Sequence, residues 1–264
     1  MVGMLIGLQG WAQEFIQPPT YSLNAYINKV SIFSFSGNPA TLAEMKSGSM
    51  GVYSERKYLL PELNLFHASI ALPSTSGNFG GIINYGGNSG YNELKAGLAY
   101  SRKLGTLADL GMQLNFNSIR ISGYGKAGIL TVQLGSIFHL TDYLHSGFQI
   151  EWPANKNFGV NKEESWSLNY SYGIGYDLSD KCSMAFVINK KENRDAEING
   201  GFQYEPGKKR LIAMGVCTPI HGVWMRMGVK ARSVLIELSS LYHPQLGISP
   251  GLAISWNFKN DKPD

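Results

Sequence analysis

The sequence is poor in charged residues and cysteine, and it has no long hydrophobic run. Only 16% of its 264 residues are Asp, Glu, Lys or Arg, against about 25% in an average soluble domain. No stretch approaches the roughly 20 consecutive apolar residues that a transmembrane helix requires, so a helical membrane protein is excluded. Hydrophobic residues nevertheless make up 44% of the chain, which is too many for a disordered protein.

Charge and cysteine content exclude further classes of protein. The net charge is only +4 and the basic residues are scattered, so no nucleic acid is expected as a partner. Cys182 and Cys217 are the only cysteines, too few for a zinc site built from paired CxxC motifs. The strand layout set out below places them on non-adjacent strands, which predicts two free thiols rather than a disulfide.

What the sequence does contain is much glycine and a regular alternation of apolar and polar residues. Glycine accounts for 31 residues, about 12% of the chain against a usual ~7%. From about residue 48 onward, apolar side chains occupy every second position, which predicts β-strands with one apolar face. The clearest segments are 94–100, 110–116, 130–138, 166–176 and 252–258.

Two properties of these strands favour a membrane barrel over a soluble sandwich. The alternating segments have about 10–14 residues, whereas strands in soluble sheets usually have about 5–6. Their second face consists of Gly, Ser, Asn and Gln rather than Lys and Glu, as suits a narrow polar interior. Because lipid offers no hydrogen-bond partner to a sheet edge, a sheet that spans a membrane must close on itself.

We therefore predict an all-β fold, a transmembrane antiparallel β-barrel of about 14 strands over residues 47–258, followed by a short tail at 259–264. Its expected location is the cell outer membrane, with outer-membrane lipid around it. The turns fall into two classes, as the two ends of such a barrel require. Tight turns are expected at 105–106, 141–142, 179–181, 206–207 and 231–232, and longer loops at 121–125, 153–164 and 190–195.

The N-terminal region does not alternate and is expected to lie outside the sheet. Residues 1–12 combine an apolar stretch with a small-residue cleavage site, which predicts a signal peptide, truncated because no Lys or Arg precedes that stretch. Residues 13–46 are expected to form a leader that enters the barrel as a plug. Within it, Asn38 can cap a short helix over 40–45, which Pro39 initiates.

Three groups of residues could carry chemistry, and each has a simpler structural interpretation. Gly123–Gly128 matches GxGxxG, but a dinucleotide site needs a helix after this loop and here a strand follows. His139 and His145 share the inward face of one hairpin and could form a metal or catalytic dyad, although hydrogen-bonded histidines are the simpler interpretation. His67 and Ser69 supply the residue types of an esterase without its motif. No enzymatic activity, cofactor or metal is therefore expected.

The polar face of the strands predicts which residues line the interior. By parity these are polar throughout, which disfavours a fatty substrate, and they comprise Lys95, Asp109, Gln113, Asn115, Gln133, Glu151, Arg226 and Glu237. A two-residue turn at 231–232 would place Arg226 directly opposite Glu237. A cross-strand ion pair of this kind contributes only about 0.2–1 kcal/mol.

Three short segments resemble the PorV/PorQ group of outer-membrane proteins, relatives of the FadL-type fatty-acid channels. They are Ser36-Gly37-Asn38-Pro39-Ala40, where that group has an Asn-Pro-Ala motif, the turn at Tyr176–Lys181, and His243–Gly247 before the last strand. The resemblance covers about residues 30–258. It implies a fourteen-stranded barrel and an association with type IX protein secretion, in which PorV-like members receive cargo that carries a C-terminal sorting domain.

The sequence thus leaves three functions open, one of which, a structural barrel that scaffolds partners, the sequence does not separate from the leading hypothesis. The leading hypothesis is a non-enzymatic outer-membrane barrel associated with type IX secretion, with the translocon or its cargo as partner. The alternative is a FadL-like channel for hydrophobic small molecules, which needs an apolar pocket and a movable leader. The residues singled out are structural, with no catalytic, cofactor-binding or metal-binding role assigned: Asn38, Pro39, Ala40, Arg226 and Glu237.

Overall fold

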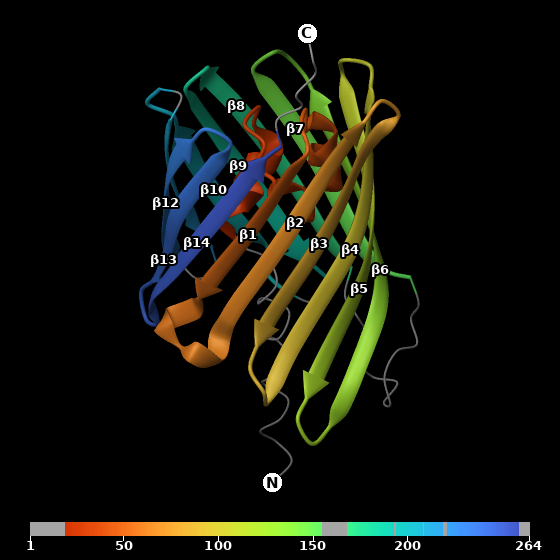
Figure 1. Ribbon diagram of the computed structural model, residues 1–264, viewed down its shortest axis with the longest axis vertical. Coiled ribbons are helices and arrows are strands. Elements are labelled where there is room, and N and C mark those ends of the chain that lie inside the picture. Colours follow the sequence, from red (N-terminus) through yellow and green to blue (C-terminus); the bar gives the residue numbers. More distant parts are fainter. Residues whose placement is uncertain (1–18, 155–167, 193, 208, 219–220, 259–264) are drawn as a thin grey trace.

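The protein forms a closed β-barrel in the computed structural model (Figure 1). The structure describes residues 19–154, 168–192, 194–207, 209–218 and 221–258. Fourteen antiparallel strands follow one another around the barrel in sequence order, and the last strand pairs with the first to close it. The predicted signal peptide at 1–12 and the tail at 259–264 lie outside the described residues.

The strands have 8 to 15 residues. Their bounds are β1 Ser49–Arg56, β2 Asn64–Ser74, β3 Gly77–Gly87, β4 Tyr91–Leu104, β5 Ala108–Ile121, β6 Gly125–His139, β7 Leu144–Pro153, β8 Asn169–Ser179, β9 Cys182–Lys191, β10 Glu197–Tyr204, β11 Arg210–Cys217, β12 Gly222–Ala231, β13 Val234–His243 and β14 Gly247–Asn257. At about 3.3 Å per residue and a tilt of about 40°, ten residues span about 25 Å, which matches the apolar band of outer-membrane barrels.

The outer surface of the barrel is apolar. Along each strand, large hydrophobic side chains alternate with buried ones, and the outward ones are strongly exposed, Leu98 by 74%, Leu238 by 64% and Val52 by 53%. So many exposed apolar side chains would make a soluble protein aggregate, whereas the hydrocarbon core of a membrane solvates them favourably. The prediction of an all-β transmembrane barrel of about 14 strands is therefore confirmed. Among the described residues, no helix is long and apolar enough to cross a membrane.

The two rims of the barrel carry different connections. The hairpins β2–β3, β4–β5, β6–β7, β8–β9, β10–β11 and β12–β13 turn at the rim drawn uppermost in Figure 1, where β14 also ends. The short 3₁₀ helices η5 Lys57–Leu59 and η6 Pro61–Leu63 connect β1 to β2 at the opposite rim. Cys182 on β9 and Cys217 on β11 are free and on non-adjacent strands, as predicted.

The predicted register of the β12–β13 hairpin was wrong. Its two-residue turn lies at 232–233, one residue later than predicted, so Arg226 pairs with Ser239 and not with Glu237. Arg232 supplies the positive φ, 55°, that a tight hairpin turn needs. Arg226 and Glu237 still meet diagonally, with Nε 3.4 Å from Oε1, because both side chains point into the barrel.

The described part of the leader, residues 19–46, lies inside the barrel (Figure 1). It contains three 3₁₀ helices, η2 Pro19–Tyr26, η3 Ser34–Ser36 and η4 Pro39–Glu44. The short helix expected over 40–45 is η4, of the 3₁₀ type. Asn38 is its N-cap, and the Asn38 side chain accepts a hydrogen bond from the Ala40 backbone N–H at 3.1 Å. The leader side chains that pack on the wall are almost completely buried. Helices η2, η3 and η4 therefore fill the part of the barrel in which they lie.

Candidate functional site: the plugged interior

The start of η4 rests directly on the barrel wall at two glycines. A Cβ atom at Gly135 would collide with Asn38 Oδ1, and one at Gly111 would collide with the Pro39 carbonyl group. Asn38 also donates from Nδ2 to the Ser136 carbonyl oxygen at 3.2 Å. The same asparagine therefore caps the leader helix and joins it to the wall, at a place where only glycine leaves room.

Tyr26 of η2 rests on three further glycines. Its ring lies against Gly147 and Gly173, and its carbonyl oxygen would collide with any Cβ atom at Gly175. The sequence predicts only that such inward glycines line a narrow polar interior, and it does not identify Tyr26 as their partner. The signal that could have located this contact is the alternation of glycine at 173 and 175 beside another inward glycine on the neighbouring strand.

The interior is not polar throughout, contrary to the sequence-based expectation. One apolar cluster joins the leader side chains Tyr21, Phe33, Phe35 and Leu42 to the wall residues Tyr53, Leu65 and Ile82. A second joins Leu23, Tyr26 and Ile27 of the leader to Val187, Trp224 and Leu241 of the wall. Parity correctly identified inward positions, but it gave too little weight to the apolar residues among them, whose partners come from the leader.

Between the apolar clusters, the predicted polar interior residues form hydrogen-bonded networks. All eight of them are buried. Lys95 Nζ lies 3.1 Å from Glu151 Oε1. The same carboxylate accepts from Thr131 Oγ1 at 2.7 Å and from Asn115 Nδ2 at 3.1 Å. With these additional donors the buried ion pair has its hydrogen-bonding needs met. The network therefore joins the four neighbouring wall strands β4, β5, β6 and β7.

Arg226 is the centre of a second network that includes the leader. Its Nη2 donates to Asn24 Oδ1 at 2.7 Å and to Gln203 Oε1 at 2.9 Å. The guanidinium carbon lies 4.4 Å from the centroid of the Tyr21 ring, and the Tyr21 hydroxyl donates to Glu237 at 3.2 Å. The Arg226–Glu237 pair therefore binds the N-terminal part of the leader as well as stabilising the hairpin.

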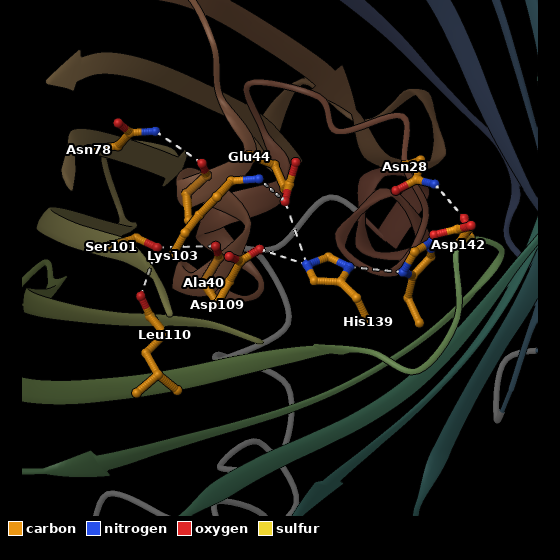
Figure 2. Close-up of polar contacts among 12 residues, drawn as sticks. Asn28, Ala40, Glu44, Asn78, Ser101, Lys103, Asp109, Leu110, His139 and Asp142 are labelled. Atoms are coloured by element: carbon orange, nitrogen blue, oxygen red, sulfur yellow. Dashed lines mark hydrogen bonds and ion pairs between the residues drawn. The ribbon is translucent and has the colours of Figure 1, made fainter. Parts of the chain in front are cut away.

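A third cluster lies near the rim with the tight turns and contains the two histidines singled out in the sequence. Figure 2 shows His139 beside Asp109 and Glu44. His139 Nδ1 lies 3.0 Å from His145 Nδ1. At the outer ends of this pair, His139 Nε2 lies 3.0 Å from Asp109 Oδ2 and His145 Nε2 lies 3.1 Å from Asp177 Oδ2. Glu44 of the leader approaches His139 Nε2 to 3.5 Å.

The other two sequence motifs are parts of the barrel wall. His67 Nε2 lies 2.5 Å from Ser69 Oγ, and its Nδ1 contacts Asn84. These side chains are buried, and the Phe33 ring of the leader lies 5.4 Å from the His67 ring, so the docked leader covers this pair. Gly123–Gly128 forms a hairpin turn and the start of β6, without the helix that a dinucleotide site needs.

Comparison with known proteins gives no sequence relatives but several similar structures. No protein family model and no curated protein match the chain. The monoaromatic hydrocarbon channel CymD is similar with a TM-score of 0.64 at 12% identity, over 87% of this chain and 93% of CymD. The Ralstonia pickettii toluene transporter TbuX has a TM-score of 0.64 at 8% identity, over 93% of this chain and 100% of its own. A Pseudomonas aeruginosa FadL homologue has a TM-score of 0.62 at 10% identity, over 93% and 100%.

The chain has the fold of these channels. With its apolar exterior, it is placed in the cell outer membrane, as predicted. At such low identity the likeness concerns the fold and not the substrate. None of the three is a PorV or PorQ protein, so the resemblance to that group stays a prediction.

Proposed function

We propose that the protein is a non-enzymatic channel for small hydrophobic molecules, with the leader as its movable plug. The observation that carries this proposal is the pair of apolar clusters shared by leader and wall. If the leader shifts, wall residues such as Leu65, Ile82 and Val187 face the interior. Pockets for small apolar ligands are lined in this way, with a few polar groups beside them. The fold shared with hydrocarbon channels supports the same choice.

The apolar clusters also explain why such a channel would discriminate against polar solutes. Separating a fully buried Leu or Phe side chain from its partners costs about 1.5–3 kcal/mol. A hydrocarbon that takes the place of the leader offsets this loss because it restores apolar contacts. A polar solute does not, so it leaves the plug in place.

Uptake by whole cells tests the proposal, because their outer leaflet slows the entry of hydrocarbons. Cells that express the protein should take up isotope-labelled toluene faster than cells with an empty vector, and glucose at an unchanged rate. Two adjacent residues supply matched variants. Ile82 faces inward with 3% exposure and Ile83 faces outward with 56% exposure. Ile82→Thr should lower the rate severalfold and Ile83→Thr should not. Equal uptake with and without the protein, or equal effects of both variants, contradicts the proposal.

The second candidate function is association with type IX secretion. The observation that favours it is the resemblance of Ser36–Ala40 to the Asn-Pro-Ala motif of the PorV/PorQ group. Affinity purification from detergent-solubilised outer membranes, read by mass spectrometry, tests it. Recovery of the translocon, or of cargo with a C-terminal sorting domain, supports the secretion role. Recovery of the barrel alone, with co-purified hydrophobic molecules, supports the channel.

A further inference from the structure

The histidine cluster near the rim with the tight turns brings together ionisable groups from five elements. Figure 2 labels three of these groups, Glu44, Asp109 and His139. Glu44 belongs to η4 of the leader, whereas Asp109, His139, His145 and Asp177 belong to β5, β6, β7 and β8. The plugging of the barrel by apolar contacts does not require this arrangement. The function proposed above makes no use of it either.

The hydrogen bonds of the cluster can be followed from Asp177 toward Glu44. The Asp177 carboxylate accepts from the Asn28 backbone N–H at 3.2 Å and from Ser183 Oγ at 2.5 Å. Since this carboxyl group acts as an acceptor, His145 Nε2 carries a proton and donates to it. A neutral His145 then has an unprotonated Nδ1, and this atom must accept from His139 Nδ1.

This arrangement determines whether His139 Nε2 carries a proton. If His139 donates through Nδ1 and is neutral, its Nε2 presents a lone pair to the oxygen atoms of Asp109 and Glu44 at 3.0 and 3.5 Å. A lone pair facing two carboxylates is unfavourable unless a cation lies between them. Because the two Nδ1 atoms face each other, the cluster needs one additional positive charge, carried either by a second proton on His139 or His145 or by a metal ion at His139 Nε2.

The three groups also have the spacing of metal ligands. Their donor atoms all lie within 4.8 Å of one another. A tetrahedral Zn²⁺ ion with bonds of about 2.1 Å separates its ligand atoms by about 3.4 Å, close to the 3.0 and 3.5 Å measured from His139 Nε2. We propose that Glu44, Asp109 and His139 bind a divalent transition-metal ion, Zn²⁺ being the best match to one imidazole and two carboxylates.

The surroundings of His139 fit this role. A metal-bound histidine usually donates its other ring N–H to a fixed acceptor. Here His139 Nδ1 faces His145 Nδ1, which is itself oriented by the Asp177 carboxylate. The His139 and Glu44 side chains are 20% and 22% exposed, so an ion can reach them from the rim. Three protein ligands leave a fourth position for water.

Lys103 is the group that competes with the metal. Its Nζ lies 2.6 Å from Glu44 Oε1, and its side chain is 48% exposed. The exposed Lys103 side chain can swing into solvent when an ion binds. Removing its charge should therefore strengthen metal binding.

A bound ion would join η4 of the leader to β5 and β6 of the wall. Metal binding would thus hold the plug in place, whatever the channel carries. The site is tested with the full-length protein in detergent, stripped of metals with a chelator and titrated with Zn²⁺ in a calorimeter. One ion should bind per chain, and Mg²⁺ should not compete because it prefers six oxygen ligands.

Variants of two of the three ligands, Glu44 and His139, assign the binding to this site. Glu44→Gln and His139→Gln should each weaken Zn²⁺ binding at least tenfold, and Lys103→Met should strengthen it. His221→Asn is the matched control, because His221 is an exposed histidine far along the chain, and Asn tolerates its φ of 47°. Its Zn²⁺ affinity should equal that of the unaltered protein.

A second measurement keeps the test independent of folding. Heat-dependent mobility on gels establishes that each variant still forms the barrel, and Glu44→Gln changes the leader alone. Co²⁺ in place of Zn²⁺ should give the intense visible absorption bands of a tetrahedral site, and His139→Gln should abolish them. The absence of one-to-one Zn²⁺ binding, a loss of less than tenfold in either ligand variant, or weaker binding by Lys103→Met overturns the proposal.

Discussion

Removing the carboxylate of Glu237 should destabilise both the barrel and its plug. Arg226 and Glu237 are only 1% and 2% exposed, with Nε 3.4 Å from Oε1. The substitution Glu237→Leu leaves a buried guanidinium without its counterion, and breaking a buried pair in this way costs about 3–5 kcal/mol. This exceeds the contribution of an exposed cross-strand pair several times over. The buried Tyr21 hydroxyl also loses its acceptor, which weakens the docking of the leader by about 1–3 kcal/mol.

The loss is measured by urea unfolding in lipid bilayers, followed by tryptophan fluorescence, and the docking of the leader by its resistance to protease. The double variant Arg226→Met/Glu237→Leu should recover most of the stability, because apolar side chains replace the whole pair. Glu62→Leu, at an exposed position in η6, is the control. A loss below about 1 kcal/mol for Glu237→Leu, or a double variant less stable than the single one, would refute this reasoning.

Two further substitutions test the plug and the polar interior. Gly175→Val should expel the leader, because the valine side chain would occupy the position of the Tyr26 carbonyl group. The leader should then become sensitive to protease. The outward-facing control Gly81→Ala should leave it protected. Lys95→Met should lower the unfolding free energy by about 3–5 kcal/mol, because Glu151 stays buried and loses its ammonium partner. Adding Glu151→Gln to Lys95→Met should restore part of that loss, and a further decrease in the urea midpoint would contradict the assignment.

The barrel could be predicted from the sequence because its cause is local and repeated. Period-two alternation places one side chain outward and the next inward at every step, independently of the rest of the fold. The turn at 232–233 could not be located in the same way. Its position depends on a positive φ at Arg232, a conformation that arginine rarely adopts. The turn contains no glycine or asparagine, the residues that usually indicate such a conformation in a sequence.

The interior was harder to predict because it depends on where the leader lies. The hairpin alone placed His139 beside His145, but no strand pattern could bring Glu44 to the same place. Likewise, the inward glycines at 173 and 175 marked a close approach without naming Tyr26 as the group that approaches. Where a strand contacts the leader, the strand sequence carries a recognisable feature, such as an inward glycine. The leader has no periodic pattern that would show which of its residues makes the contact.

The path of the leader has a consequence for how the sheet closes. The β1–β14 seam joins the strands that are farthest apart in sequence, so it involves the largest loss of chain entropy of any pairing in the barrel. The leader precedes every strand, and η4 packs on β3 to β6 while η2 packs on β7 to β10 and on β12. Strands from both halves of the sheet thus share contacts with one segment. In the folded barrel the leader is an inner surface around which the sheet curves, on both sides of its closing seam.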